Sequence, residues 1–426
     1  MILENPYIEV IAVCVIIIIS YFFNLFAKKT NVPSVLMLIF LGIGINYFLK
    51  TIDFQLNIDL QGMLNLLGII GLIMIVLEAA LDLKLTKEKQ PLILKSFFIA
   101  FLGLFACAFS IAWILNEYVI GNFFQAFIYA IPLSIMSSAI IIPSVVNLVD
   151  SKKEFMIYEG TFSDILGIML FYFVMENENS KVVEITGNVS LNIGVTILLS
   201  FLVSYILVYI LQSIDQKVKL FLLIAVLVLL YSVGKLFHLS SLIVILIFGL
   251  ILNNYKIFFF GKMRKMVNKI KLAHVLDDFH VVTMESAFVV RTFFFIIFGM
   301  TLDLNSLIDL NTALISGGII LVIYVIRYIL FKAFQIKSIF PEVLIAPRGL
   351  ITVLLFFGIP QAYQFEGFNT GILLYIILLT SIIMTFSMLA KGDESEYVAE
   401  LTFEDWDDLD KEIKELENKS EETKVS

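Results

Sequence analysis

Charge is scarce in this chain. Only 15% of its 426 residues are charged, 60% are hydrophobic, and the mean hydropathy is +0.98. Soluble domains carry about 25% charged and about 45–50% apolar residues, so this composition excludes a soluble enzyme, a disordered chain and a nucleic-acid-binding protein. With only 8 prolines, most apolar runs can form unbroken helices. The runs do not alternate apolar with polar residues, which excludes a membrane β-barrel.

Cysteine and histidine are equally rare. The two cysteines, Cys14 and Cys107, lie in apolar runs, which excludes a disulfide framework and favours small buried side chains. The three histidines (His238, His274 and His280) do not have the spacing of metal ligands on one helix. A glycine-rich phosphate loop is also missing from the sequence. We therefore expect no cofactor, no nucleotide partner and no ATP-driven pump.

What the chain has in abundance is long apolar runs. There are thirteen, at about 7–27, 32–49, 62–81, 91–115, 123–149, 155–174, 191–213, 218–236, 239–253, 283–301, 308–331, 340–359 and 371–390. A helix needs about 20 apolar residues to cross a bilayer. The sequence therefore predicts an all-α polytopic membrane protein with about 13 transmembrane helices, occupying residues 1–390.

The loops between these runs predict the orientation. Alternate loops, starting after the first run, hold eighteen Lys and Arg residues, and the opposite loops hold three. Basic residues accumulate on the cytoplasmic side. The amino terminus is therefore expected outside and the carboxyl terminus in the cytoplasm, which agrees with an odd number of spans in the inner (cell) membrane.

Two segments outside the spans have distinctive compositions. Residues 391–426 carry 14 acidic and 5 basic residues and are predicted to be an acidic cytoplasmic tail, in which 402–416 can form a short amphipathic helix. The inner loop at 254–282 is basic and aromatic. It is either an amphipathic helix on the inner leaflet or a basic connector.

Two pairs of spans resemble one another. SVLMLIFLGIGINY from Ser34 matches SLIVILIFGLILNNY from Ser241, with Gly42 and Asn46 at the positions of Gly249 and Asn253. IVLEAALDL in the third span likewise matches IIFGMTLDL in the tenth. Both pairs lie seven spans apart, so the copies face opposite ways across the membrane. Inverted repeats of this kind are typical of secondary transporters.

The same repeat relates the fifth and twelfth spans, and both contain helix breakers. The fifth reads SIMSSAIIIPS, with Ser137, Ser138 and Pro143, and the twelfth reads IAPRGLIT around Arg348. Non-helical backbone at membrane depth is tolerated only where it is buried in protein or lines a cavity. Interrupted segments at matching positions in two repeats indicate a transport site.

Asp164 is the deepest acidic residue, ten residues from the end of the sixth span. A lone carboxylate at this depth can hold a proton or a small cation, which is what exchange of H⁺ against a monovalent ion requires. Hydroxyls available to complete a cation shell are Thr161, Ser163, Ser137 and Ser138. The alternative for Asp164 is a structural ion pair with an arginine.

The remaining charges within the spans are expected to play supporting roles. Glu159 lies five residues before Asp164, about 140° around the helix, so a pair with Arg327 in the eleventh span is expected over the alternative of a second transported-proton site. Arg348 lies at the break of the twelfth span, where it can balance helix dipoles or pair with an acid. Arg291 can approach the sixth span, and Glu78 is expected to contact a basic group near the membrane edge.

At these residues the chain resembles the monovalent cation:proton antiporter superfamily, the sodium/proton exchangers of the NhaP and NapA type. Five stretches in family order carry the resemblance: PSVLMLIFLGIGI, LEAALDLKL, YEGTFSDILGIMLF, RTFFFIIFGMTLDL and APRGLITVLL. The chain departs from the family at Ser163, where relatives have Asn or Asp, and at 140–143, where Ile-Ile-Ile-Pro replaces Ala-Thr-Asp-Pro. The serine implies electroneutral exchange, and the missing threonine leaves Na⁺ and K⁺ as alternative substrates.

The resemblance implies an NhaA-like fold with crossing discontinuous helices and a homodimer in the lipid bilayer. Spans 1–3 and 8–10 would form the dimerisation side, and spans 4–6 and 11–13 the mobile core. It also implies that Asp164 is the ion-binding aspartate, that Glu159 pairs with Arg327, and that Arg291 occupies the place of a lysine in electrogenic relatives.

The expected function is therefore Na⁺ (or Li⁺)/H⁺ antiport by alternating access, with Na⁺ bound at Asp164. One alternative is K⁺/H⁺ antiport or K⁺ efflux, and another is a transport-inactive membrane sensor that acts through the acidic tail. An intramembrane enzyme is not expected, because no histidine and no second aspartate lie deep in a span.

Overall fold

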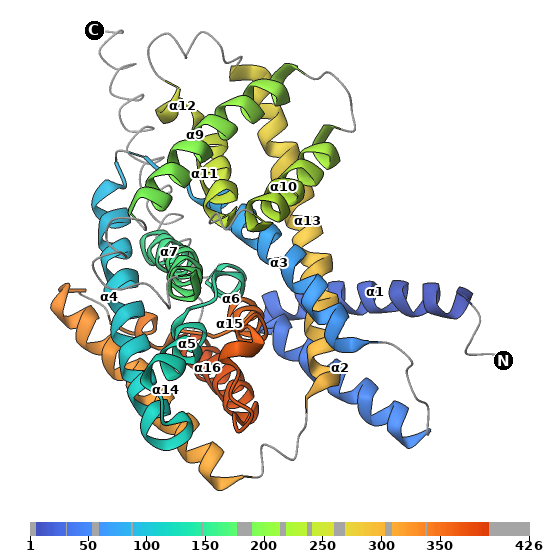
Figure 1. Cartoon of the computed structure of the whole chain (residues 1–426), viewed down its shortest axis with the longest axis vertical. Helices are drawn as coiled ribbons and strands as arrows, with labels where there is room; N and C mark the ends of the chain where they lie inside the picture. Colours follow the sequence, from blue (N-terminus) through green and yellow to red (C-terminus); the bar gives the residue numbers. More distant parts are fainter. Residues whose placement is uncertain are drawn as a thin grey trace, which may run out of the picture.

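A computed structural model gives the fold (Figure 1). It describes residues 6–30, 32–52, 59–86, 88–145, 148–176, 190–213, 219–236, 241–259, 269–302, 309–336 and 339–391. Within these ranges the secondary structure is helical and contains no strand. The predicted tail at 391–426 lies outside them except for Lys391, and so does His238.

Helices occupy all the predicted apolar segments. In chain order they are α1 (Pro6–Thr30), α2 (Ser34–Thr51), α3 (Leu60–Asp82), α4 (Gln90–Leu115), the π-helical η1 (Asn116–Ile120), α5 (Phe123–Ser134), α6 (Ser138–Ser144), α7 (Asp150–Glu176), α9 (Ser190–Ser213), α10 (Lys219–Leu236), α11 (Ser241–Asn253), α12 (Tyr255–Phe258), α13 (Lys269–Thr301), α14 (Leu310–Ala333), η5 (Glu342–Leu344), α15 (Leu350–Phe357), η6 (Gln361–Tyr363) and α16 (Gly371–Lys391).

Nine helices of the described chain are long and apolar enough to cross a membrane, and three shorter apolar stretches lie at Leu198–Ile210, Leu220–Val233 and Leu242–Asn253. The polytopic helical architecture is therefore confirmed, and the number of thirteen crossings stays a prediction. One boundary was wrong. Residues 269–282, placed in the inner loop as either an amphipathic helix or a basic connector, are helical and form the first part of α13, whereas 260–268 of that loop lie outside the described residues. With 33 residues this helix is about 50 Å long, well beyond the roughly 30 Å of a hydrocarbon core.

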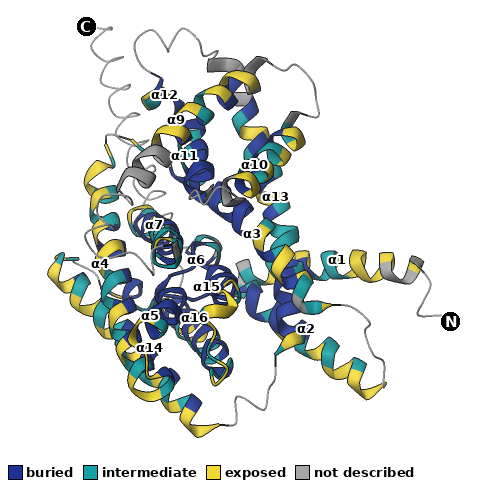
Figure 2. Ribbon diagram, in the orientation of Figure 1, coloured by how far each residue is buried: buried dark blue, intermediate teal, exposed yellow. Residues whose placement is uncertain are grey.

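The helices pack in two groups (Figure 1). The α3–α13 group contains α1, α2, α3, α9, α10, α11 and α13. The α4–α7 group contains α4, α5, α6, α7, α14, α15 and α16. Fewer contacts join the two groups, chiefly from α15 and α7 to α3. Helix α1 stands apart with an exposed apolar surface (Figure 2), as expected of a helix that faces lipid.

Helix contacts in the α3–α13 group follow the predicted repeat. If α2 corresponds to α11 and α3 to α13, then α2 packs on α13 as α11 packs on α3, and both contacts are present. Each uses a glycine from the matched motif, Gly42 against Gly299 in one pair and Gly249 against Ala80 in the other. Small residues at such crossings let helix backbones approach closely.

An asparagine side chain also forms a hydrogen bond between the two helices of each pair. The Asn46 side chain donates to the Met300 carbonyl near the end of α13, at 2.8 Å. In the other repeat the side chain of Asn254, the residue that follows the matched Asn253, donates to the Leu83 carbonyl at the end of α3, at 2.8 Å. Asn254 also accepts the Leu85 amide at 2.7 Å.

The Gly42–Gly299 crossing makes a stability prediction. A Cβ at Gly42 would overlap the Ile296 carbonyl and lie 3.0 Å from the Gly299 Cα, and backbone cannot yield as a flexible side chain can. We expect Gly42→Ala to destabilise the protein by about 1–3 kcal/mol, measured as thermal unfolding in detergent. Gly44→Ala on the same helix is the control, because no atom lies within 4 Å of its Cβ position. If both variants unfold alike, the close crossing does not limit stability.

Candidate functional site

The candidate site lies where α7 passes the interrupted helix pair α5–α6. Glycines on α7 allow this close approach: a Cβ at Gly167 would overlap the Ile135 side chain, and one at Gly160 would lie 3.0 Å from Cδ1 of Ile141. Asp164 lies between these two glycines in the sequence and is 2% exposed. The sequence therefore places a carboxylate on a helix that can approach backbone directly.

The first break is at residues 135–137, between α5 and α6. The predicted breaker Pro143 lies inside α6 instead, so that detail was wrong. The amide of Met136 donates to the Ser163 hydroxyl at 2.9 Å, and the amide of Ser138 donates to Oδ2 of Asp164 at 3.0 Å. Buried backbone groups need partners, so the α7 side chains make the break possible.

The second break, at residues 345–349, crosses the first. The Ser137 amide donates to the Pro347 carbonyl at 2.9 Å. A Cβ at Gly349 would lie 2.6 Å from the Ser137 hydroxyl and 2.8 Å from Cδ1 of Ile140, so a larger residue does not fit without a shift. The two interrupted segments of the predicted repeat therefore touch at their non-helical residues.

Arg348 ties the second break to the end of α5. It is 1% exposed and donates to the carbonyls of Leu133, Ser134 and Ala346 at 3.0, 3.1 and 2.8 Å. The last carbonyls of a helix lack partners within the helix and carry partial negative charge. Of the two roles open to Arg348, the structure therefore has it balancing a helix end.

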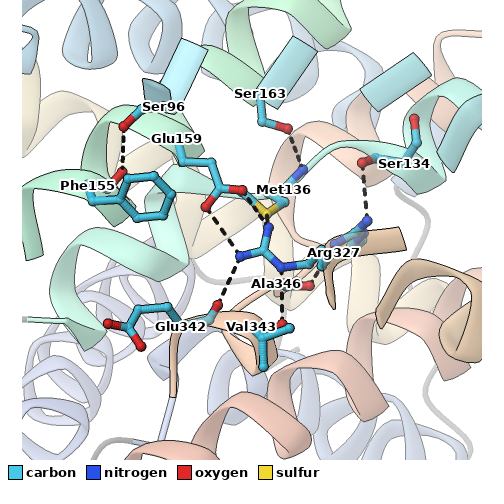
Figure 3. Close-up of polar contacts among 11 residues, drawn as sticks. Ser96, Ser134, Met136, Phe155, Glu159, Ser163, Arg327, Glu342, Val343 and Ala346 are labelled. Atoms are coloured by element: carbon cyan, nitrogen blue, oxygen red, sulfur yellow. Dashed lines mark hydrogen bonds and ion pairs between the residues drawn. The ribbon is translucent and has the colours of Figure 1, made fainter. Parts of the chain in front are cut away.

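Glu159 and Arg327 form a buried ion pair beside these breaks (Figure 3). The guanidinium donates to both carboxylate oxygens, at 2.7 and 3.2 Å, and the two side chains are 2% and 6% exposed. Arg327 also donates to the carbonyls of Glu342 and Val343 at 2.9 and 3.1 Å. The pair links α7 to α14 and to η5, the short helix that precedes the second break.

Asp164 has no cationic partner of this kind among the residues that the structure describes. Its Oδ2 accepts the Ser138 amide, but its Oδ1 is buried without a hydrogen-bond partner among the described residues. The hydroxyl of Thr161, nearly one turn earlier on α7, is likewise buried and unpartnered there. Unsatisfied buried oxygens are rare and costly, so these two atoms are where a proton or a hard cation gains most.

The predicted serines contact the two breaks, whereas Arg291 lies elsewhere. Ser163 and Ser138 contact the first break and Asp164 directly, through a hydroxyl and an amide respectively. Ser137 contacts the second break through its amide, and its hydroxyl lies against Gly349. Arg291, which was expected to approach the sixth span, pairs instead with Glu78 of α3 at 3.2 Å. One helical turn along α3, Asp82 contacts His280 at 2.8 Å.

Comparison with known proteins shows which family has this architecture. The sequence matches the family described as sodium/hydrogen exchanger, transmembrane, over residues 13–391. The chain belongs to the sodium/hydrogen exchanger family. It is therefore a multi-pass membrane protein of a cation/proton antiporter family. A direct comparison with curated protein sequences finds no match.

Solved exchanger structures have the same fold. The structure of the sodium proton antiporter MjNhaP1 from Methanocaldococcus jannaschii at pH 8 superposes with a TM-score of 0.66 at 18% identity, covering 91% of this chain and 99% of that one. An electron-microscopy map of the same antiporter superposes with a TM-score of 0.62 at 17% identity, covering 93% and 98%. At this identity the likeness concerns the fold.

Some residues around the candidate site were missed from the sequence. Glu342 is 2% exposed and pairs with Lys152 at 3.2 Å, but it was not among the intramembrane charges considered from the sequence. Thr352 of α15 also has a buried hydroxyl that has no hydrogen-bond partner among the described residues. Its place four residues after Arg348 and three after Gly349 is the one signal that could have marked it. Groups of three or more His, Cys, Asp or Glu that could hold a metal are absent from the described residues.

Proposed function

We propose that this chain exchanges Na⁺ (or Li⁺) for H⁺, one for one, across the inner membrane by alternating access around Asp164. The observation that carries the proposal is Oδ1 of Asp164, which is buried and unpartnered among the described residues. A carboxylate in this state gains from binding either a proton or a cation, and it cannot hold both. Competition for one group couples the two ions.

The geometry suggests which atoms would hold the cation. Oδ1 of Asp164 and the Thr161 hydroxyl lie on one side of α7 and have lone pairs to offer, because the described residues leave both without partners. The Ser138 amide fixes the other carboxylate oxygen. Hard monovalent cations bind carboxylate, hydroxyl and carbonyl oxygens, and the interrupted backbone at 135–137 is a source of carbonyls.

Electroneutral exchange is supported by the charges around Asp164. The preceding residue is Ser163, which does not titrate and already accepts the Met136 amide. Arg327 is balanced by Glu159, and Arg291 by Glu78. One titratable carboxylate is then left to alternate between proton and cation, so no net charge moves per cycle.

Alternating access would come from movement of the α4–α7 group against the α3–α13 group. The proposal is supported by the distribution of contacts, which are dense within each group and fewer between them. Asp164, both breaks and the Glu159–Arg327 pair all belong to the α4–α7 group, so the site would move as one unit. A homodimer formed through the α3–α13 group would hold the other half still in the bilayer.

Ion exchange in proteoliposomes tests this function. With a pH dye inside and an imposed ΔpH, we expect Na⁺ or Li⁺ to dissipate the gradient, and K⁺ or Rb⁺ to have little effect. Protein-free liposomes are the control, and an added ionophore for membrane potential should not change the rate if exchange is electroneutral.

Two other outcomes of this experiment would favour a different function. A response to K⁺ alone would favour K⁺/H⁺ antiport, for which the Ile-Ile-Ile-Pro sequence at 140–143 is the supporting observation, since a threonine ligand is missing there. A lack of response to every cation would contradict antiport and favour a membrane sensor acting through residues 391–426.

A further inference from the structure

Glu342 is a buried carboxylate outside the ion site. It lies in η5, three residues before the second break, and its side chain is 3% exposed. Its Oε1 lies 3.2 Å from Nζ of Lys152, and its Oε2 has no partner among the described residues. Lys152 is on the first turn of α7 and is 20% exposed. A buried carboxylate is costly without a counter-charge, and Lys152 supplies that counter-charge to Glu342.

Arg327 holds the same short helix from another side. Its guanidinium donates to the backbone carbonyls of Glu342 and Val343 while it binds Glu159. In Figure 3 the carboxylate of Glu342 points away from this guanidinium. Lys152 and Glu159 are seven residues apart on α7, about two turns, and so lie on one face. Helix α7 is therefore connected to η5 at two points. Lys152 binds the Glu342 side chain, and Glu159 binds Arg327, which donates to the η5 backbone.

The position of η5 affects the proposed ion site through the segment that follows it. Residues 345–349 follow η5, and the Pro347 carbonyl among them accepts the Ser137 amide at 2.9 Å. The next amide, that of Ser138, donates to Asp164 at 3.0 Å. A displacement of η5 along α7 would therefore shift the donor that fixes the Asp164 carboxylate.

We propose that Lys152 and Glu342 are positioning residues, whose ion pair holds the second broken segment in register with α7 and so sets the cation affinity of Asp164. The inference rests on the proposed function, because it assigns the pair an effect on the ion bound there. This role is specific to Lys152. If Lys152 served only as one of the basic residues on the cytoplasmic side, its neighbour Lys153 would serve equally well.

The test compares exchange kinetics of full-length variants in proteoliposomes, using whichever cation the wild type transports. Lys152→Gln and Glu342→Gln are expected to raise the apparent KM for the cation about tenfold with little change in maximal rate, as loss of an outer-shell partner does at other ion sites. Lys152→Arg should keep the wild-type KM. The double exchange Lys152→Glu with Glu342→Lys should recover most of the affinity.

Lys153→Gln is the matched control, because it removes the same charge one residue away and is expected to leave KM unchanged. A second readout is the Na⁺ or Li⁺ concentration that half-saturates thermal stabilisation in detergent, which reports binding even where transport is slow. Variants are compared only where thermal unfolding remains cooperative, and Lys152→Gln at the partly exposed end of the pair is the safer of the two single changes.

The outcomes distinguish a failure of this inference from a failure of the proposed antiport function. If the wild type exchanges ions, Asp164→Asn does not, and Lys152→Gln loses stability with an unchanged KM, the pair is structural and the inference is overturned. Equal effects of Lys152→Gln and Lys153→Gln, or failure of the double exchange to restore affinity, also overturn it. If the wild type itself exchanges no cation, the proposed function fails and this inference fails with it.

Discussion

Asp164→Asn is expected to abolish coupled exchange, leaving no cation-driven pH change above that of protein-free liposomes. Asparagine has nearly the same shape, and its carbonyl can still accept the Ser138 amide that Oδ2 accepts in the native protein. It cannot bind or release a proton, and it offers no charge to a cation. The substitution therefore removes the competition between the two ions while preserving the local packing.

The measurement pairs transport with binding. Cation-dependent thermal stabilisation in detergent should also disappear in Asp164→Asn, because a ligand stabilises only the state that binds it. Asp150→Asn is the matched control, since it makes the same chemical change at the exposed start of the same helix. Exchange retained by Asp164→Asn at the wild-type rate would refute the assignment of this carboxylate.

Arg327→Met is expected to destabilise the protein by about 3–5 kcal/mol, because it leaves Glu159 buried without its partner. The loss also removes the bonds from Arg327 to the Glu342 and Val343 carbonyls. The double variant Glu159→Gln with Arg327→Met should lose less than the sum of the two single changes, since neither then leaves a lone buried charge. Thermal and denaturant unfolding in detergent would measure the coupling.

Lys332→Met provides the comparison for Arg327→Met. It removes a positive charge from the same helix, but Lys332 is exposed and lies 5.7 Å from the centre of the Tyr328 ring as its one described aromatic contact. We expect it to cost about 1 kcal/mol or less. An Arg327→Met variant as stable as Lys332→Met would show that the ion pair contributes little to the fold.

The predictions made from the sequence succeeded where the signal is local or periodic. The repeat was visible because Gly42 and Gly249 recur in matching apolar runs, and both lie at close helix crossings. The pairing of Glu159 with Arg327 followed from the high cost of a lone charge in a membrane, together with the family resemblance. Each inference needed only a pattern along the chain.

Other details depended on contacts that no local pattern encodes. The first break falls at residues 135–137, not at Pro143, because the Ser163 hydroxyl and the Asp164 carboxylate accept the amides that a helix would otherwise use. Arg291 pairs with Glu78 because α13 packs on α3. In each case the partner is far away in sequence.

Hydropathy is enough to specify a helical membrane protein, and the spacing of glycines together with a lone aspartate in an apolar run is enough to predict the repeat and the candidate site. These features follow from the cost of burying charge and unpaired backbone in lipid, which acts on every residue separately. Which amide meets Asp164, which acid balances each arginine, and how Lys152 reaches Glu342 were decided by the tertiary structure. Those contacts join helices across the fold, so their energies depend on where each helix lies relative to the others.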